Sequence, residues 1–156
     1  MALLPHLRRG LLVAVALTAV AGAGCAGSTA PTKEEYVAVA DDVCRQTQDK
    51  LEEAEVTLVE ETAQAAEDGE TSDYQQRPDR WTRAKIIPLY RQMRDGLRGI
   101  PPPDGDAEYL ADLYDDLARL VDDLHYRPGQ GRDLIRKDAE LEERFSSYGM
   151  KVCGTV

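Results

Sequence analysis

Leucines recur at helical spacing between residues 110 and 124, and this repeat limits the fold more than any other feature of the chain. The letters LYDDL at 113–117 are followed seven residues later by LVDDL at 120–124. Residues three and four apart share one helix face, so the pattern predicts a helix over 106–125 with a buried seam. No segment after residue 32 alternates as a β-strand would, so we expect an all-α fold. The seam consists of Leu110, Leu113, Leu117, Leu120 and Leu124.

A first helix is predicted over 33–68 from the way it begins and from its apolar residues. Thr32 and Glu35 have the spacing of a capping box, in which each side chain accepts a hydrogen bond from the other residue's free backbone N–H. The predicted buried stripe consists of Tyr36, Ala40, Val43, Thr47, Leu51, Ala54 and Leu58, with Cys44 at its edge.

A second helix is predicted over 78–98, and Pro88 must kink it or divide it. Trp81, Ala84 and Ile87 form one line of expected core residues, out of phase with a line that follows Pro88. That second line consists of Leu89, Met93, Leu97 and Ile100.

A fourth helix is predicted over 132–148, with Gly149 as its left-handed cap. Its expected core residues are Leu134, Ile135, Leu141, Phe145 and Tyr148. Four helices with short connections predict an up-down bundle.

The first 25 residues have the order of an export signal. Arg8 and Arg9 precede an apolar run at 11–20, which is followed by small residues and then Cys25. The run is about half the ~20 residues of a membrane-spanning helix, so we do not expect a permanent span. We therefore divide the chain into a lipoprotein signal peptide (1–24), a flexible tether (25–32) and a helical domain (33–156).

The small residues before Cys25 resemble the lipobox of bacterial lipoproteins, although Gly22 stands where that pattern prefers Leu or Val. The resemblance implies acyl chains on Cys25 that anchor the protein in the cell membrane, on its extracytoplasmic face. The alternative is a secreted protein cut by the ordinary signal peptidase. The two arginines leave both the general secretory and the twin-arginine route open, and the first is favoured.

Two cysteines remain besides Cys25. In an oxidising compartment, Cys44 and Cys153 are best interpreted as a structural disulfide, with two separate buried thiols as the alternative. The pair is not a Cys-x-x-Cys motif, so we expect no redox role.

Charge excludes one class of partner. Without residues 1–24 the chain has 17 basic and 29 acidic residues, a formal charge of −12, so nucleic acid is not an expected partner. The segment 77–98 is the exception at +5, whereas 106–126 carries −6. We favour pairing between these helices over a cationic surface for an anionic ligand.

No residue set identifies a reaction, a metal or a cofactor. The acids Glu108 and Asp112 and the Asp-Asp pairs near them lack the glycine turn of a calcium loop. His125 is the only histidine after the signal, and Asp122 with His125 is half of a carboxylate-bundle metal motif at most. We therefore expect a solvated acidic face, no cofactor, and a protein that is not an enzyme.

Two functional hypotheses remain open, together with a purely structural role. The first is an interaction module for a protein of the cell envelope, which an exposed apolar strip would support. The second is a small-ligand pocket near Pro88 for an anionic or aromatic molecule. Its expected lining residues are Trp81, Tyr90, Arg91 and Arg94.

The domain as a whole resembles the small helical lipoproteins of actinobacteria, a group of unassigned function. The resemblance lies in the lipobox, in EYVAVADDVC at 35–44, in PPPDGD at 101–106 and in GMKVCG at 149–154. It implies export, a helical fold and the Cys44–Cys153 bridge, and it transfers no active site.

Overall fold

The computed structural model describes residues 30–69 and 76–156. The predicted signal peptide, Cys25 and most of the predicted tether lie outside these residues. All regular structure in the two described ranges is helical. The prediction of an all-α fold is therefore confirmed for this part of the chain.

Helix α1 (Lys33–Glu67) begins as the sequence predicts. The Thr32 hydroxyl accepts from the Glu35 N–H at 3.2 Å, and the Glu35 carboxylate accepts from the Thr32 N–H at 2.9 Å. The predicted stripe faces the core, although Val43, Leu51 and Leu58 are only partly buried and Cys44 is fully buried.

The second predicted helix is continuous but irregular at Pro88. It consists of α2 (Arg77–Trp81), a π-helical turn η1 (Thr82–Ile86) and α3 (Ile87–Arg98). Pro88 has no N–H, and its ring would clash with the carbonyl four residues earlier. The wider π turn, in which the Ile87 N–H donates to the Thr82 carbonyl, lies immediately before Pro88.

The π turn also corrects the predicted core line before Pro88. Ala84, within the turn, is exposed and Trp81, just before it, is partly buried, whereas Ile87 is buried as predicted. After Pro88, Met93 and Leu97 are buried as predicted, whereas Leu89 and Ile100 are partly buried. The fully buried residues around the turn are Thr82, Ile86, Ile87 and Tyr90.

Helix α4 (Ala107–Tyr126) confirms the leucine seam, since all five predicted leucines are buried. The 3-10 turn η2 (Pro128–Gln130) then leads into α5 (Gly131–Lys137) and α6 (Ala139–Tyr148), and η3 (Cys153–Thr155) closes the chain. Gly149 is the left-handed cap of α6, with φ 117°.

The single fourth helix predicted over 132–148 is wrong, because the helix is broken at Asp138. The Asp138 carboxylate accepts a hydrogen bond from the Leu141 N–H at 3.4 Å and so caps α6. A side-chain hydrogen bond of this kind to a nearby backbone N–H gives the chain an alternative to continuing the helix. Leu141, Phe145 and Tyr148 are buried as predicted, whereas Leu134 and Ile135 in α5 are only partly buried.

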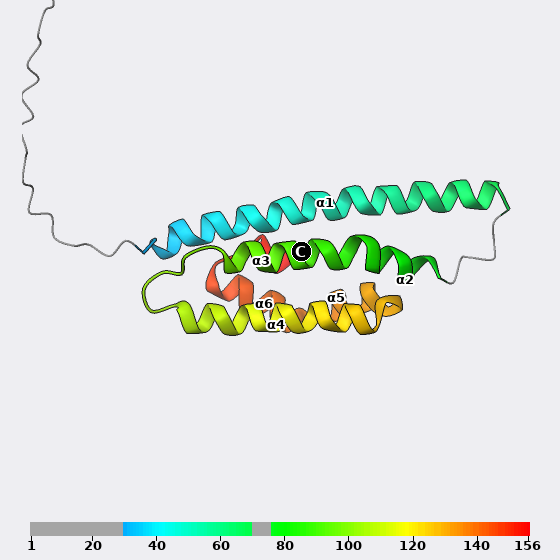
Figure 1. The fold of residues 1–156 in the computed structure, drawn as a ribbon. Helices are drawn as coiled ribbons and strands as arrows, with labels where there is room; N and C mark the ends of the chain where they lie inside the picture. Colours follow the sequence, from blue (N-terminus) through cyan, green and yellow to red (C-terminus); the bar gives the residue numbers. More distant parts are fainter. Residues whose placement is uncertain (1–29, 70–75) are drawn as a thin grey trace, which may run out of the picture.

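The helices form the predicted up-down arrangement (Figure 1). Helix α3 lies between α1 and α4 and packs against both, and α5 and α6 pack on α4. Helix α1 is much the longest, and its C-terminal part continues past the ends of α4 and α5, where only α2 lies beneath it.

The end of the bundle where α1 begins is tied to the chain's C-terminal segment. The predicted disulfide joins Cys44 to Cys153, with the two Cα atoms 5.0 Å apart. One carboxylate oxygen of Asp41 accepts from the backbone N–H groups of Val152 at 3.0 Å and Cys153 at 3.3 Å. Met150 is fully buried beside them in the core.

A buried polar pair lies in this same end. The hydroxyls of Tyr36 on α1 and Tyr114 on α4 are hydrogen-bonded to each other inside the core. Burial raises the pKa of both phenols, so both stay neutral. The Tyr148 hydroxyl donates to the Asp106 carboxylate at 2.6 Å and extends the network toward the start of α4.

Candidate functional site

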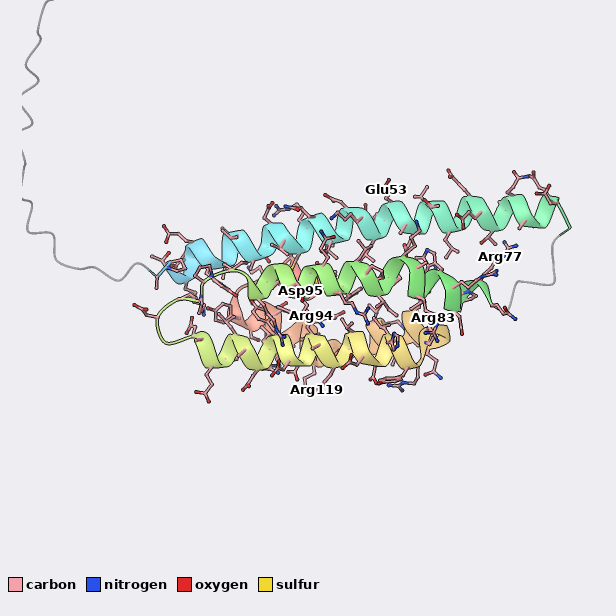
Figure 2. All side chains as sticks on the ribbon, in the orientation of Figure 1. Glu53, Arg77, Arg83, Arg94, Asp95 and Arg119 are labelled. Carbon is pink, nitrogen blue, oxygen red and sulfur yellow. A yellow bond between two sulfur atoms is a disulfide. The ribbon has the colours of Figure 1, made fainter. Side chains whose placement is uncertain are left out.

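The structure brings together only part of the predicted ligand site. Trp81 and Tyr90 line one cavity of about 390 Å³, whereas Arg91 and Arg94 line neither this cavity nor the one next to it. Arg94 extends from α3 toward α4 (Figure 2), and its guanidinium lies 2.8 Å from the Asp95 carboxylate. The cations that line these cavities are Arg132 and Arg136 of α5 and Arg77 of α2.

Tyr90 is a core residue more than a surface contact. Its side chain is 2% exposed and belongs to the main hydrophobic cluster. Burial, with added repulsion from Glu142 and Asp138, raises the pKa of its phenol. Tyr90 therefore forms the inner end of the cavity as a neutral group.

A second cavity, of about 760 Å³, continues from the first toward the end of α1. Trp81, Thr82, Gly131 and Arg132 line both cavities, so the two meet there. We call the combined depression the α1–α5 groove. Its α1 wall consists of Gln48, Leu51, Glu52, Glu55, Leu58, Val59, Thr62, Ala63 and Ala66.

The floor of the α1–α5 groove comes from the second predicted helix, and its other wall comes from η2 and α5. The floor residues are Arg77, Pro78, Trp81, Thr82, Ile86 and Tyr90, and Thr155 and Val156 of the C-terminal segment close the inner end beside Gln48. The residues of the η2–α5 wall are Pro128, Gly129, Gln130, Gly131, Arg132, Asp133, Ile135 and Arg136.

Two features hold the second wall in place. A Cβ atom at Gly131 would lie 2.9 Å from the Thr82 hydroxyl oxygen, so only glycine allows α5 to begin this close to η1. Asp138 then ends the wall by breaking the helix after α5. The groove therefore exists because α5 is short and packs on α4, leaving one side of α1 uncovered.

Trp81 stands at the junction of the two cavities. Its indole N–H donates to the Ala54 carbonyl on α1 at 3.3 Å. The Arg132 guanidinium lies 5.7 Å from the ring centroid, within the range of a cation–π contact. These contacts fix the ring between α1 and α5.

The outer half of α1 exposes apolar side chains beside the α1–α5 groove. Val56 is 58% exposed and Val59 is 64% exposed, and Val59 lines the groove. With Ala63 and Ala66 they follow steps of three and four along one helix face. This is the apolar strip that the interaction hypothesis requires.

The two walls of the α1–α5 groove differ in charge. Residues 51–69 contain seven acids and no basic residue, and Glu52 and Glu55 line the groove. The opposite wall has Arg132 and Arg136. Other acids in this half of α1 point elsewhere, as Glu53 does on the side facing away from α3 (Figure 2).

Between α3 and α4, both wholly within the described residues, the predicted pairing of basic and acidic helices is found at one position. Arg98 on α3 forms an ion pair with Asp115 on α4. In the described ranges, Arg83, Lys85 and Arg91 are exposed and have no ion-pair partner. Packing between α3 and α4 is therefore mainly apolar, through the leucine seam.

The other sequence candidates lie apart from the α1–α5 groove. Glu108, Asp112 and Asp122 are exposed, and the exposed His125 ring contacts Tyr126 edge to face. Over residues 30–69 and 76–156, no three His, Cys, Asp or Glu side chains are grouped to hold a metal ion. Nor does any helix there have the length and apolarity needed to cross a membrane.

Sequence reasoning did not identify Val59, Ala63 or Arg132 as surface residues of a site. One signal could have done so, because the first predicted helix is far longer than the 20 residues of the third. A helix that outlasts its neighbours must leave part of its apolar face uncovered.

The chain was also compared with known proteins. No protein-family model, no curated protein and no solved structure matches it.

Proposed function

We propose that the protein is a lipid-anchored, extracytoplasmic and non-enzymatic module that binds a protein of the cell envelope through the α1–α5 groove. The observation that carries this proposal is the apolar strip of α1, exposed beside a groove that the bundle leaves open. Exposed apolar patches of this kind are typical of interaction sites.

The direction of α1 is consistent with an anchor on Cys25. Helix α1 begins eight residues after Cys25, at the end of the bundle that the Cys44–Cys153 disulfide ties. At 1.5 Å per residue, Val59 lies about 39 Å farther along the helix. An anchor at residue 25 would therefore hold the disulfide-tied end nearer the membrane and leave the groove accessible.

A small-ligand role is the second candidate, and the inner cavity favours it. A volume of about 390 Å³ beside Trp81 and Tyr90 lies within the range of small-molecule sites. Arg132 and Arg136 would there supply the positive charge for an anionic group.

Cross-linking and co-purification of the full-length protein from its native membrane tests the proposal. Val59→Asp alters the groove wall, and Val39→Asp is the matched control, because Val39 is also exposed on α1 (52%) but lies near the other end. Cys25→Ala tests the anchor. We expect one specific partner with the unmodified chain and with Val39→Asp, and loss of that partner with Val59→Asp.

Other results would contradict parts of the proposal. Membrane retention of Cys25→Ala would refute lipid anchoring. Equal recovery of the partner with both valine variants would refute the groove as the binding surface. Recovery of the protein alone would favour the small-ligand candidate.

A further inference from the structure

We propose that the α1–α5 groove takes an amphipathic helix of the partner protein, oriented so that a basic flank of that helix lies along α1. The proposal rests on the proposed function and specifies the chemistry of the partner. Its grounds are the length of the groove, its apolar lining and the charge of its two walls.

The shape of the groove favours a helix over a compact molecule. The α1 wall extends from Gln48 to Ala66, which is about 27 Å at 1.5 Å per residue. The wall residues recur every three or four positions, so they form one continuous face of a straight helix. A partner helix of about 18 residues would match this length.

The floor provides apolar contacts along the whole length. Tyr90 and Ile86 lie at the inner end, Trp81 in the middle and Pro78 at the outer end. Amphipathic helices bind grooves of this kind through apolar residues at i, i+3, i+4 and i+7. The partner helix would thus complete the bundle on the side of α1 that α5 leaves uncovered.

Charge determines which helix fits. The inner half of the α1 wall presents Glu52 and Glu55, whereas the outer half is uncharged and has Arg77 of the floor beside it. The α1 helix of a second copy carries the same acids and would be repelled. A helix with lysine or arginine on the flank beside α1 is the complementary occupant.

The wall opposite α1 already carries two arginines, so the partner helix needs no positive charge on the flank beside α5. Arg136 is bonded to Asp133 at 2.6 Å, and Arg132 lies over the Trp81 ring. Both cations line the groove, together with Asp133. The flank beside α5 should therefore be acidic or neutral.

Two synthetic 18-residue helical peptides provide the test. Both have the same apolar face and glutamates on one flank, and the other flank has lysines in the first peptide and glutamates in the second. Each is titrated into the full chain in a non-ionic detergent, and the emission of Trp81 is followed. Trp81 is the only tryptophan, so any change in emission arises at this residue, which lines both cavities of the groove.

We expect the lysine peptide to change the Trp81 emission and to bind about tenfold more tightly than the glutamate peptide. The double variant Glu52→Gln/Glu55→Gln should reduce this preference. Glu34→Gln is the control, since Glu34 is an exposed acid of α1 at the far end, and it should leave the preference unchanged.

The proposal is overturned if neither peptide changes the emission, if both bind equally, or if the double variant keeps the full preference. Sedimentation of the chain alone supplies a further outcome. A dimer that Val59→Asp dissociates would identify a second copy as the occupant and would also overturn the proposal. The two experiments can also disagree. If a partner is lost with Val59→Asp in co-purification but the two peptides bind equally, the proposed function stands and only this inference is refuted.

Discussion

At the end of the bundle where α1 begins, the helices are held together by a disulfide, by the Asp41 carboxylate and by a buried tyrosine pair. At the end where α1 finishes, other helices cover only part of the surface of α1 (Figure 1). Both regions expose apolar side chains, but Val39 and Tyr109 in the first lie away from the α1–α5 groove, whereas Val56 and Val59 in the second lie beside it. If the proposed function is correct, stability and binding depend on different parts of one helix. Substitutions in the two regions should therefore have different consequences.

The largest expected effect comes from introducing the same charge into each region. Leu117→Asp places a carboxylate in the fully buried seam and should cost about 5 kcal/mol or more, enough to unfold the bundle. Val59→Asp places the same group on the exposed strip and should cost less than about 1 kcal/mol. Thermal melting followed by circular dichroism measures both. Equal melting temperatures for the two variants would contradict the division.

Removal of the disulfide should produce the next largest effect. Cys44 and Cys153 are 109 residues apart, and the chain-entropy model assigns a loop of this length about 4.7 kcal/mol. Cys44→Ala/Cys153→Ala should therefore lower the stability by about 3–5 kcal/mol. Denaturant unfolding measures the loss, and the unmodified protein with reductant serves as the control. An unchanged transition midpoint would show that the stability of the bundle does not depend on the disulfide.

A smaller effect is expected at the buried tyrosine pair. Tyr114→Phe leaves the Tyr36 hydroxyl in the core without its partner, which should cost about 1–3 kcal/mol. Tyr36→Phe/Tyr114→Phe removes both polar groups and should be closer to the unmodified protein than the single variant is. Denaturant unfolding of the three proteins measures the difference. A double variant as unstable as Tyr114→Phe, or less stable, would contradict the interpretation.

The smallest effect is expected at Asp138, on the boundary between the two regions. Burial raises the pKa of this carboxyl, and Glu140 and Asp123 add to the increase. Because the folded pKa exceeds the unfolded one, stability is lost as the pH rises from the unfolded value through the folded value. Asp138→Asn keeps an acceptor for the Leu141 N–H and should raise the melting temperature near neutral pH.

The pH series provides the check on Asp138. The gain in melting temperature from Asp138→Asn should shrink in acid, where the unmodified carboxyl is already protonated. A gain of the same size at all pH values would show that ionisation of Asp138 is not its cause.

Sequence patterns predicted the elements of the fold better than the site. The seam from Leu110 to Leu124 and the capping box at Thr32 were predictable because each depends on residues a few positions apart. The Cys44–Cys153 bridge was predictable from the count of cysteines and the expected compartment. The break at Asp138 was missed because its capping bond competes with a helix that the apolar pattern equally allows.

The α1–α5 groove depends on tertiary packing, which periodicity does not specify. Trp81 was identified from its residue type, but its neighbours Arg132 and Ala54 come from distant parts of the chain. Arg91 and Arg94, predicted beside Trp81, do not line the groove, whereas Arg77 does. The π turn before Pro88 also changes the phase of the helix, so counting from Trp81 leads to the wrong side chains.

The link between Cys44 and Cys153 also governs what a protease can release. A single cut in the backbone between these residues yields two pieces that stay covalently joined through sulfur. Whatever is attached upstream of residue 44 therefore remains on the same particle as the α4, α5 and α6 helices. Separation of the pieces requires reduction of the disulfide as well as cleavage, so a nicked protein would remain one particle until it met a reductant.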